Sequence, residues 1–155
     1  MRIVWFDASY GCAGDMCLGA LVDAGAAPAR IAEMLAGLGI GREFDLAFEK
    51  VARGAIAATK AKVWVLGHGQ GQGHGHGHGP ERRLRDVLGL IDGAKLPDRV
   101  AERASAVFRV LAGAEAKVHG QGIDEVHFHE VGAVDAIVDV VGTCAALEVL
   151  GVDEV

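Results

Sequence analysis

Imidazole and carboxylate side chains gather in one stretch of the sequence, VHFHEVGAVDAIVD, residues 126–139. If its first residues are extended, His127 and His129 lie on one side, because side chains alternate along a strand. Asp135 and Asp139 are four residues apart, so on a helix their carboxylates share one face. Acids on an otherwise apolar helix are costly to bury unless they bind a cation or a base. The stretch therefore indicates a metal or catalytic site; the alternative is that the acids face solvent or cap nearby backbone.

A second pair, Glu115 and His119, has the same spacing of four residues near the end of an expected helix. A carboxylate and an imidazole on one helical edge are suited to hold a metal ion, either as two ligands or as a ligand and its supporting partner. The alternative is a surface pair, since a cationic histidine is mildly favourable near a helix C-terminus.

A glycine-rich turn with acids stands near the N-terminus, in FDASYGCAGDM. Asp7 ends an expected strand, and Gly11, Gly14 and Asp15 lead into an expected helix. Backbone N–H groups at a helix start bind anions, and a nearby acid binds Mg²⁺. The spacing matches neither a dinucleotide fingerprint nor a Walker loop, and Asp15 as a simple helix cap is the alternative.

Residues 67–80 form a tract rich in glycine and histidine. Its four histidines, referred to as the tract histidines, are His68, His74, His76 and His78. In an extended chain, alternate residues face one way roughly 6.5 Å apart, and glycines allow the bends that chelation needs. Imidazole is a ligand for Ni, Zn, Cu and Co. The tract is interpreted as a metal-gathering loop with His74, His76 and His78 as ligands, or as a linker with incidental metal affinity. A catalytic role is not expected, because catalysis requires a rigid site.

These residues are positioned by an expected α/β (α+β) fold, with a small sheet of about three or four strands and packed helices, followed by a mainly helical lobe. Residues 2–8 predict a buried strand, two short helices follow, and 44–53 with 55–66 predict a hairpin. Helices are expected over 82–92, about 98–118 and about 133–150, and VDEV at 152–155 opens another strand. The expected units are a lobe over 1–66, the flexible loop 67–80, and a helical lobe over 81–155 that carries HFHE and packs with the first.

The composition narrows the class of protein. A hydrophobic content of 51% over 155 residues supplies a core, and the formal charge of −6 disfavours nucleic-acid binding. Three cysteines do not indicate a disulfide framework; Cys12 and Cys17 offer soft ligands, although Cys17 and Cys144 are better explained as small buried side chains. The N-terminus lacks a signal peptide, and no apolar run reaches the roughly 20 residues of a membrane helix. A cytoplasmic protein without a membrane partner is expected, and its oligomeric state, including a homo-oligomer, stays open.

The combination of FDASYGCAGDMCLGALVDAG, the histidine-rich loop, AEAKVHG and EVHFHEVGAVDAIVDVVG resembles the N-terminal part of the LarC-type nickel insertion proteins. The resemblance runs from Asp7 to about Gly151, and the HFHEVGAVD block is its most specific part. One departure is Ala13, where the family usually has a small hydroxyl residue before Gly-Asp.

The resemblance implies a CTP-dependent cyclometallase, a lyase-class chelatase that inserts Ni²⁺ into pyridinium-3,5-bisthiocarboxylic acid mononucleotide. The product is the nickel-pincer cofactor of lactate racemase, and Mn²⁺ or Mg²⁺ assists CTP hydrolysis. The resemblance also implies that the CTP-binding module is a C-terminal domain missing from this chain, without which the chain is inactive or only partly active.

Within that function, HFHE with Asp135 and Asp139 is the expected working site, with His129 or Glu130 accepting the pyridinium proton. The GCAGD turn, through Gly11, Gly14 and Asp15, is expected to bind the substrate phosphate. Two alternatives remain. One is a non-catalytic nickel or zinc storage module or metallochaperone, and the other is a metal-dependent phosphohydrolase that uses Asp7, Asp15, Asp135 and Asp139.

Overall fold

A computed structural model describes residues 1–9, 11–66, 82–128 and 133–155. The elements in these residues are α1 (Gly14–Asp23), α2 (Pro28–Ala36), β1 (Phe44–Arg53), β2 (Ile56–Val65), β3 (Arg82–Arg83), α3 (Leu84–Gly93), α4 (Asp98–His119), β4 (His127–Phe128) and α5 (Val134–Val149). The expected α+β class is confirmed. The helices expected over 82–92, 98–118 and 133–150 are confirmed as α3, α4 and α5, each within two residues at either end.

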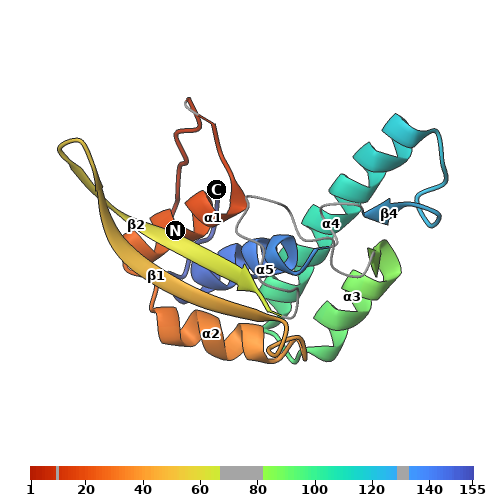
Figure 1. Ribbon diagram of the computed structural model, residues 1–155, viewed down its shortest axis with the longest axis horizontal. Helices are drawn as coiled ribbons and strands as arrows, with labels where there is room; N and C mark the ends of the chain where they lie inside the picture. The colour runs from red at the N-terminus through yellow and green to blue at the C-terminus, as the bar shows by residue number, and fades with distance from the viewer. Residues whose placement is uncertain (10, 67–81, 129–132) are drawn as a thin grey trace.

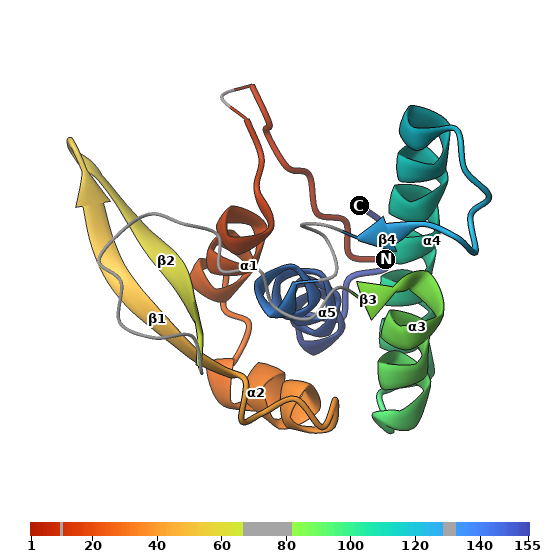
Figure 2. The same cartoon turned by 45° about the vertical axis from the view of Figure 1, so that its right-hand side comes forward.

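Helix α5 lies at the centre of the molecule and positions the rest (Figure 1). It packs against α1 and α2 on one side and α4 on another, and α3 packs against α4. The second view shows these layers in order, from the hairpin through α1 and α2 to α5 and then to α3 and α4 (Figure 2). A helix surrounded in this way must be apolar on nearly every face. Its buried residues are Val134, Ile137, Val138, Val141, Gly142, Cys144, Ala145, Ala146 and Leu147.

The predicted hairpin is confirmed, with β1 and β2 antiparallel and Phe44 opposite Val65. Gly54 turns the chain with a φ of 60°, a value that favours glycine. Strand β2 lies against α1 so closely that a Cβ on Gly19 would stand 2.4 Å from the Thr59 carbonyl oxygen. The strands form two separate pairs, β1–β2 and β3–β4, because the short β3 and β4 pair only with each other among the described residues.

The buried strand expected over 2–8 is wrong. Ile3 forms only an isolated parallel bridge with Glu154, and Ile3 and Trp5 are 57% and 83% exposed. The physical reason is that one short partner segment cannot cover both faces of an extended chain. The strand that VDEV was expected to open is limited to the same bridge, in which the Val4 N–H donates to the Glu154 carbonyl at 3.0 Å.

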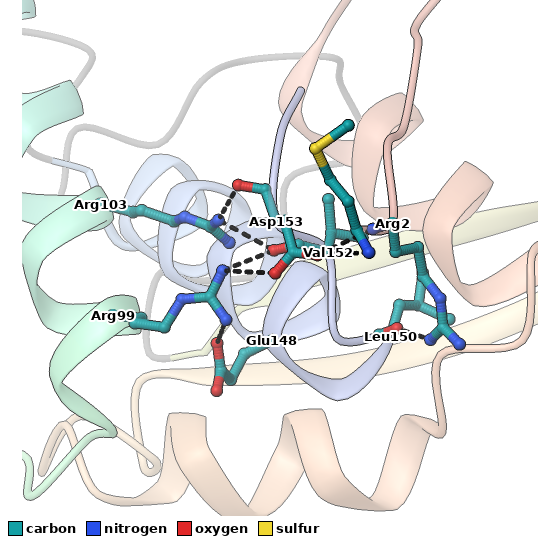
Figure 3. Close-up of polar contacts among 8 residues, drawn as sticks. Arg2, Arg99, Arg103, Glu148, Leu150, Val152 and Asp153 are labelled. Atoms are coloured by element: carbon teal, nitrogen blue, oxygen red, sulfur yellow. Dashed lines mark hydrogen bonds and ion pairs between the residues drawn. The ribbon is translucent and has the colours of Figure 1, made fainter.

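Two arginines of α4 hold the segment around Val152 in place (Figure 3). Nη2 of Arg99 and Nη2 of Arg103 donate to the Val152 carbonyl oxygen at 2.7 and 2.9 Å, and Arg103 also donates to the Asp153 carbonyl at 3.2 Å. The Arg2 backbone N–H donates to the Asp153 carboxylate at 2.7 Å. The two end segments are therefore joined to each other and to α4.

No helix in the described part of the chain combines the length and apolar character that crossing a membrane requires. The expected division into lobes at 66 and 81 stays a prediction, and the glycine-histidine tract lies outside the described residues.

Candidate functional site

The site begins where α5 meets the first turn of α1. Gly14 is the first residue of α1, and a Cβ placed on it would stand 2.6 Å from Cβ of Asp139 and 2.9 Å from its Oδ2. Real Cβ atoms do not approach so closely, so only glycine fits here. The glycine before Asp15 therefore brings the carboxylate of Asp139 onto the N-terminus of α1.

Only part of the hydrogen-bonding capacity of the Asp139 carboxylate is used in this position. It accepts a hydrogen bond from the backbone N–H of Asp15, while its buried Oδ1 has no hydrogen-bond partner among the described residues. Burial raises the pKa of the Asp139 carboxyl to about 7, with further contributions from the negative charges of Asp15 and then Asp135. The group can therefore take up or release a proton near neutral pH, or interact with a cation.

Three carboxylates from two helices line one pocket of about 570 Å³. Asp15 of α1 and Asp135 and Asp139 of α5 face residues of β2, which are Lys60, Ala61, Lys62, Val63 and Trp64. The pocket thus has three carboxylates on one wall and, on the other, a segment of β2 that contains two lysines. Such a pocket can accommodate a cation near the acids and an anionic group, such as a phosphate, near the lysines.

The segment of β2 that lines the pocket is held in position by the hairpin. Nζ of Lys62 pairs with the Glu49 carboxylate at 2.6 Å and lies 5.8 Å from the ring centroid of Trp64. Glu49 lies on β1 directly opposite Lys60 in the strand register. The lysines therefore come from a paired strand, and their backbone positions relative to α1 are fixed by the close contact at Gly19.

Two thiols lie beside these acids. Sγ of Cys12, which is exposed, is 3.0 Å from Sγ of the half-buried Cys17. Burial first, then the contact with Cys12 and the charges of Asp139 and Asp15, together raise the pKa of the Cys17 thiol to about 12. Sequence reasoning treated Cys17 as a small core residue. The signal that it missed is the position of the two cysteines around the helix start.

A second cavity, of about 510 Å³ and mostly apolar, also includes Asp139 in its lining. Its lining includes Cys17, Arg103, Thr143 and Cys144 together with Asp139. Oγ1 of Thr143 and Nη1 of Arg103 are buried there without a hydrogen-bond partner among the described residues. Asp139 therefore belongs to the lining of both cavities.

The turn before α1 has its own hydrogen bonds. The Gly11 N–H donates to the Ala8 carbonyl at 2.9 Å, and Gly11 has a φ of 97°. The N-cap residue of α1 is Ala13, without a side-chain capping bond, so Asp15 does not cap the helix as the alternative proposed. The phosphate site expected at Gly11, Gly14 and Asp15 stays a prediction, although the Asp15 N–H already binds Asp139.

Glu115 and His119 are placed elsewhere. Their Oε2 and Nε2 atoms are 3.2 Å apart near the end of α4, and in both views this end of α4 points away from α1 and β2 (Figures 1 and 2). Neither residue lines the pockets formed by Asp139. Glu115 and His119 thus do not meet the acids of α5 among the described side chains, and their metal role stays a prediction.

Other expected ligands fall outside what is described. The tract histidines, His129 and Glu130 lie in undescribed segments, and of His127 only the backbone is described, as part of β4 opposite Arg83. The carboxylate of Asp7 accepts hydrogen bonds from the N–H and Oγ of Ser9 at 3.0 and 2.5 Å. Within the described ranges, no three His, Cys, Asp or Glu side chains are already arranged around a common metal position.

Comparison with known proteins identifies the family. Residues 4–155 match the family described as nickel insertion protein. The chain belongs to this family. It is 47% identical over 153 residues to a candidate nickel insertion protein of Cyanothece sp., 48% identical over 153 residues to one of Gloeobacter violaceus, and 44% identical over 155 residues to one of Thermomicrobium roseum.

These matches to nickel insertion proteins cover 99 to 100% of this chain but only 34 to 36% of the three relatives. The chain therefore spans about a third of the length of the relatives that it matches. No solved structure matches the chain.

Proposed function

We propose that this chain is the N-terminal domain of a CTP-dependent nickel insertase that forms the nickel-pincer cofactor of lactate racemase. A role in nickel insertion follows from the family. The observation that best supports a catalytic part in it is Asp139, whose buried Oδ1 lacks a hydrogen-bond partner in the described part of the chain and lies beside two other carboxylates. The substrate is pyridinium-3,5-bisthiocarboxylic acid mononucleotide, and nickel is the second substrate.

The reaction requires a group that removes a proton from the pyridinium ring as the ring carbon bonds to nickel. The Asp139 carboxylate is suited to that step, because its pKa of about 7 lets it accept a proton and release it again near neutral pH. His129 and Glu130 remain alternatives for the same step. Lys60 and Lys62, which belong to the same pocket lining, are proposed to bind the mononucleotide phosphate.

The remaining parts of the reaction belong to the longer proteins of the family. We propose that CTP and its Mn²⁺ or Mg²⁺ ion bind to a C-terminal domain, and that this domain completes the site by covering this one. Support comes from the length of the relatives, since the chain matches only 36% of the Cyanothece protein. Activity of this chain without that domain is expected to be partial or absent.

The test is nickel transfer to the organic precursor, measured by absorption of the product, with this chain supplied together with the C-terminal domain and CTP. Asp139→Asn retains the shape and an acceptor for the Asp15 N–H, but removes the base. Insertion should fall about 100-fold or more, within the range for loss of a general base. The matched control is Asp124→Asn, which removes an exposed acid and should retain full activity. Unchanged insertion in Asp139→Asn would instead favour His129 or Glu130 as the base; unchanged insertion in the Asp139, His129 and Glu130 variants alike would favour a storage module or metallochaperone.

The glycine-histidine tract is proposed to gather nickel. Deletion of residues 68–78 should lower insertion at limiting nickel and leave it unchanged at saturating nickel. Equal losses at both concentrations would contradict a gathering role.

A further inference from the structure

The two cysteines near Asp139 are placed as a pair by the start of α1. Ala13 is the N-cap, so Cys12 is the residue before the cap and Cys17 is the fourth residue of the helix. Side chains at these two positions contact each other in many helices, usually as an apolar pair that fixes the entry of the chain. Here the pair consists of two free thiols with sulfur atoms 3.0 Å apart.

The surroundings of the thiol pair suit a cation. Cys17 lies close enough to Asp139 and Asp15 for their charges to act on it, and with Gly14 and Asp139 it lines the cavity of about 510 Å³. The buried Oδ1 of Asp139 lacks a partner among the described residues. Cys12 is exposed, so an ion can reach the pair from solvent.

The spacing of the sulfur atoms also suits a shared ion. At metal–sulfur distances of about 2.3 Å, two thiolates on one ion lie roughly 3 to 4 Å apart, so small side-chain rotations suffice. Sulfur ligands favour borderline and soft ions over Mg²⁺ or Ca²⁺. We propose that Cys12 and Cys17 form a two-thiolate site that holds nickel beside Asp139 before the ion passes to the substrate.

The choice of nickel for this site rests on the proposed function. The small number of ligands in the site also has a consequence for how the metal is held. No third Cys, His, Asp or Glu side chain of the described residues converges on the pair. An ion held by two sulfur atoms keeps open positions, whereas a closed four-ligand site retains its metal. The open positions are available to the sulfur atoms of the dithiocarboxylate substrate. Each thiol releases its proton when it binds the ion, so nickel affinity should rise with pH.

The test uses Ni²⁺ alone, titrated without oxygen into protein whose tract histidines are all replaced by glutamine. Binding to thiolate sulfur gives sulfur-to-nickel charge-transfer absorption, which imidazole and carboxylate ligands do not produce. The absorption should saturate with one ion per chain. It should disappear in Cys12→Ser and in Cys17→Ser, with affinity at least about tenfold weaker. Cys144→Ser is the matched control: Cys144 lines the same cavity from α5 but does not contact the pair, so its removal should leave the absorption in place.

Oxidation provides a second test that needs no substitution. A small-molecule disulfide accepts two electrons and two protons from the pair, giving two small thiols and a Cys12–Cys17 disulfide. The absorption should vanish on oxidation and return on reduction. Absorption that survives in Cys12→Ser, or that is absent from the reduced parent, would overturn the site.

The outcomes separate the site from the proposed function. If charge-transfer absorption is absent while nickel insertion proceeds, the thiol site is wrong and the function stands. If the absorption is present while insertion fails even with the C-terminal domain and CTP, the insertase function is wrong and the site stands.

Discussion

The free energy of unfolding should depend on pH, because the Asp139 carboxyl group is partly buried in the folded protein. Its pKa is raised from 3.8 to about 7, so the folded protein binds more protons than the unfolded chain between these values. Stability from this group is therefore present at low pH and is lost as pH rises through about 7. At about 1.4 kcal/mol per pH unit the difference corresponds to roughly 4 kcal/mol. Because the side chain is only half-buried, solvent screening reduces this to about 2 kcal/mol.

Asp139→Asn removes the charge and keeps an oxygen that accepts from the Asp15 N–H. At about pH 8 the variant should be more stable than the parent by about 2 kcal/mol, or about 4 to 8 °C in melting temperature. Near pH 4 the Asp139 side chain is uncharged in the folded protein and only about half ionised in the unfolded chain, so the difference should shrink to about 0.5 kcal/mol or less. Urea unfolding followed by circular dichroism at several pH values measures it.

Asp124→Asn is the matched control, since it makes the same change in net charge at an exposed turn. Its effect should be small and nearly independent of pH between about 4 and 8. If Asp139→Asn gives no gain at pH 8, or the same gain at pH 4, the reasoning about burial and neighbouring charge is refuted.

Gly14→Ala should lower the free energy of unfolding in urea by about 1 to 3 kcal/mol, because the new Cβ would overlap Cβ of Asp139. Gly89→Ala is the control: this residue faces open space on α3, so the change should be neutral or stabilising by up to about 1 kcal/mol. Equal effects of the two changes would argue against close packing at Gly14. Arg103→Ala removes the hydrogen bonds to the carbonyls after α5 and should speed hydrogen exchange of the Asp153 amide by about five- to tenfold, equivalent to about 1 kcal/mol. Arg109→Ala, an exposed change on the same helix, should leave that rate unchanged.

Periodicity predicted most of the helices and the hairpin, because each has a buried face that repeats along its own sequence. It failed for residues 2–8, where an apolar run indicated burial but tertiary contacts leave Trp5 exposed. The pairing of β3 with β4 was also missed, since two-residue strands have no periodicity to detect.

The candidate site was predictable only in part. The shared face of Asp135 and Asp139 follows from their spacing on a helix, and both line the same pocket. The meeting of Asp15 with Asp139 depends on the packing of α1 against α5, which no local pattern specifies. Glycine at position 14 was a usable sign of close approach, but it was interpreted as a phosphate-binding turn. The thiol pair could have been found from the positions of Cys12 and Cys17 around the expected helix start.

The contact at Gly14 also constrains how the proposed substrate can lie. The N-terminus of α1 is where a phosphate would ordinarily bind, but the Asp15 N–H already donates to Asp139 and the Gly11 N–H to the Ala8 carbonyl. A phosphate placed there would also meet the negative carboxylates. The lysines of β2 offer the opposite charge on the far wall. The proposed substrate would then extend across the pocket, with its phosphate near β2 and its reacting ring near Asp139, close to the proposed thiol site for nickel.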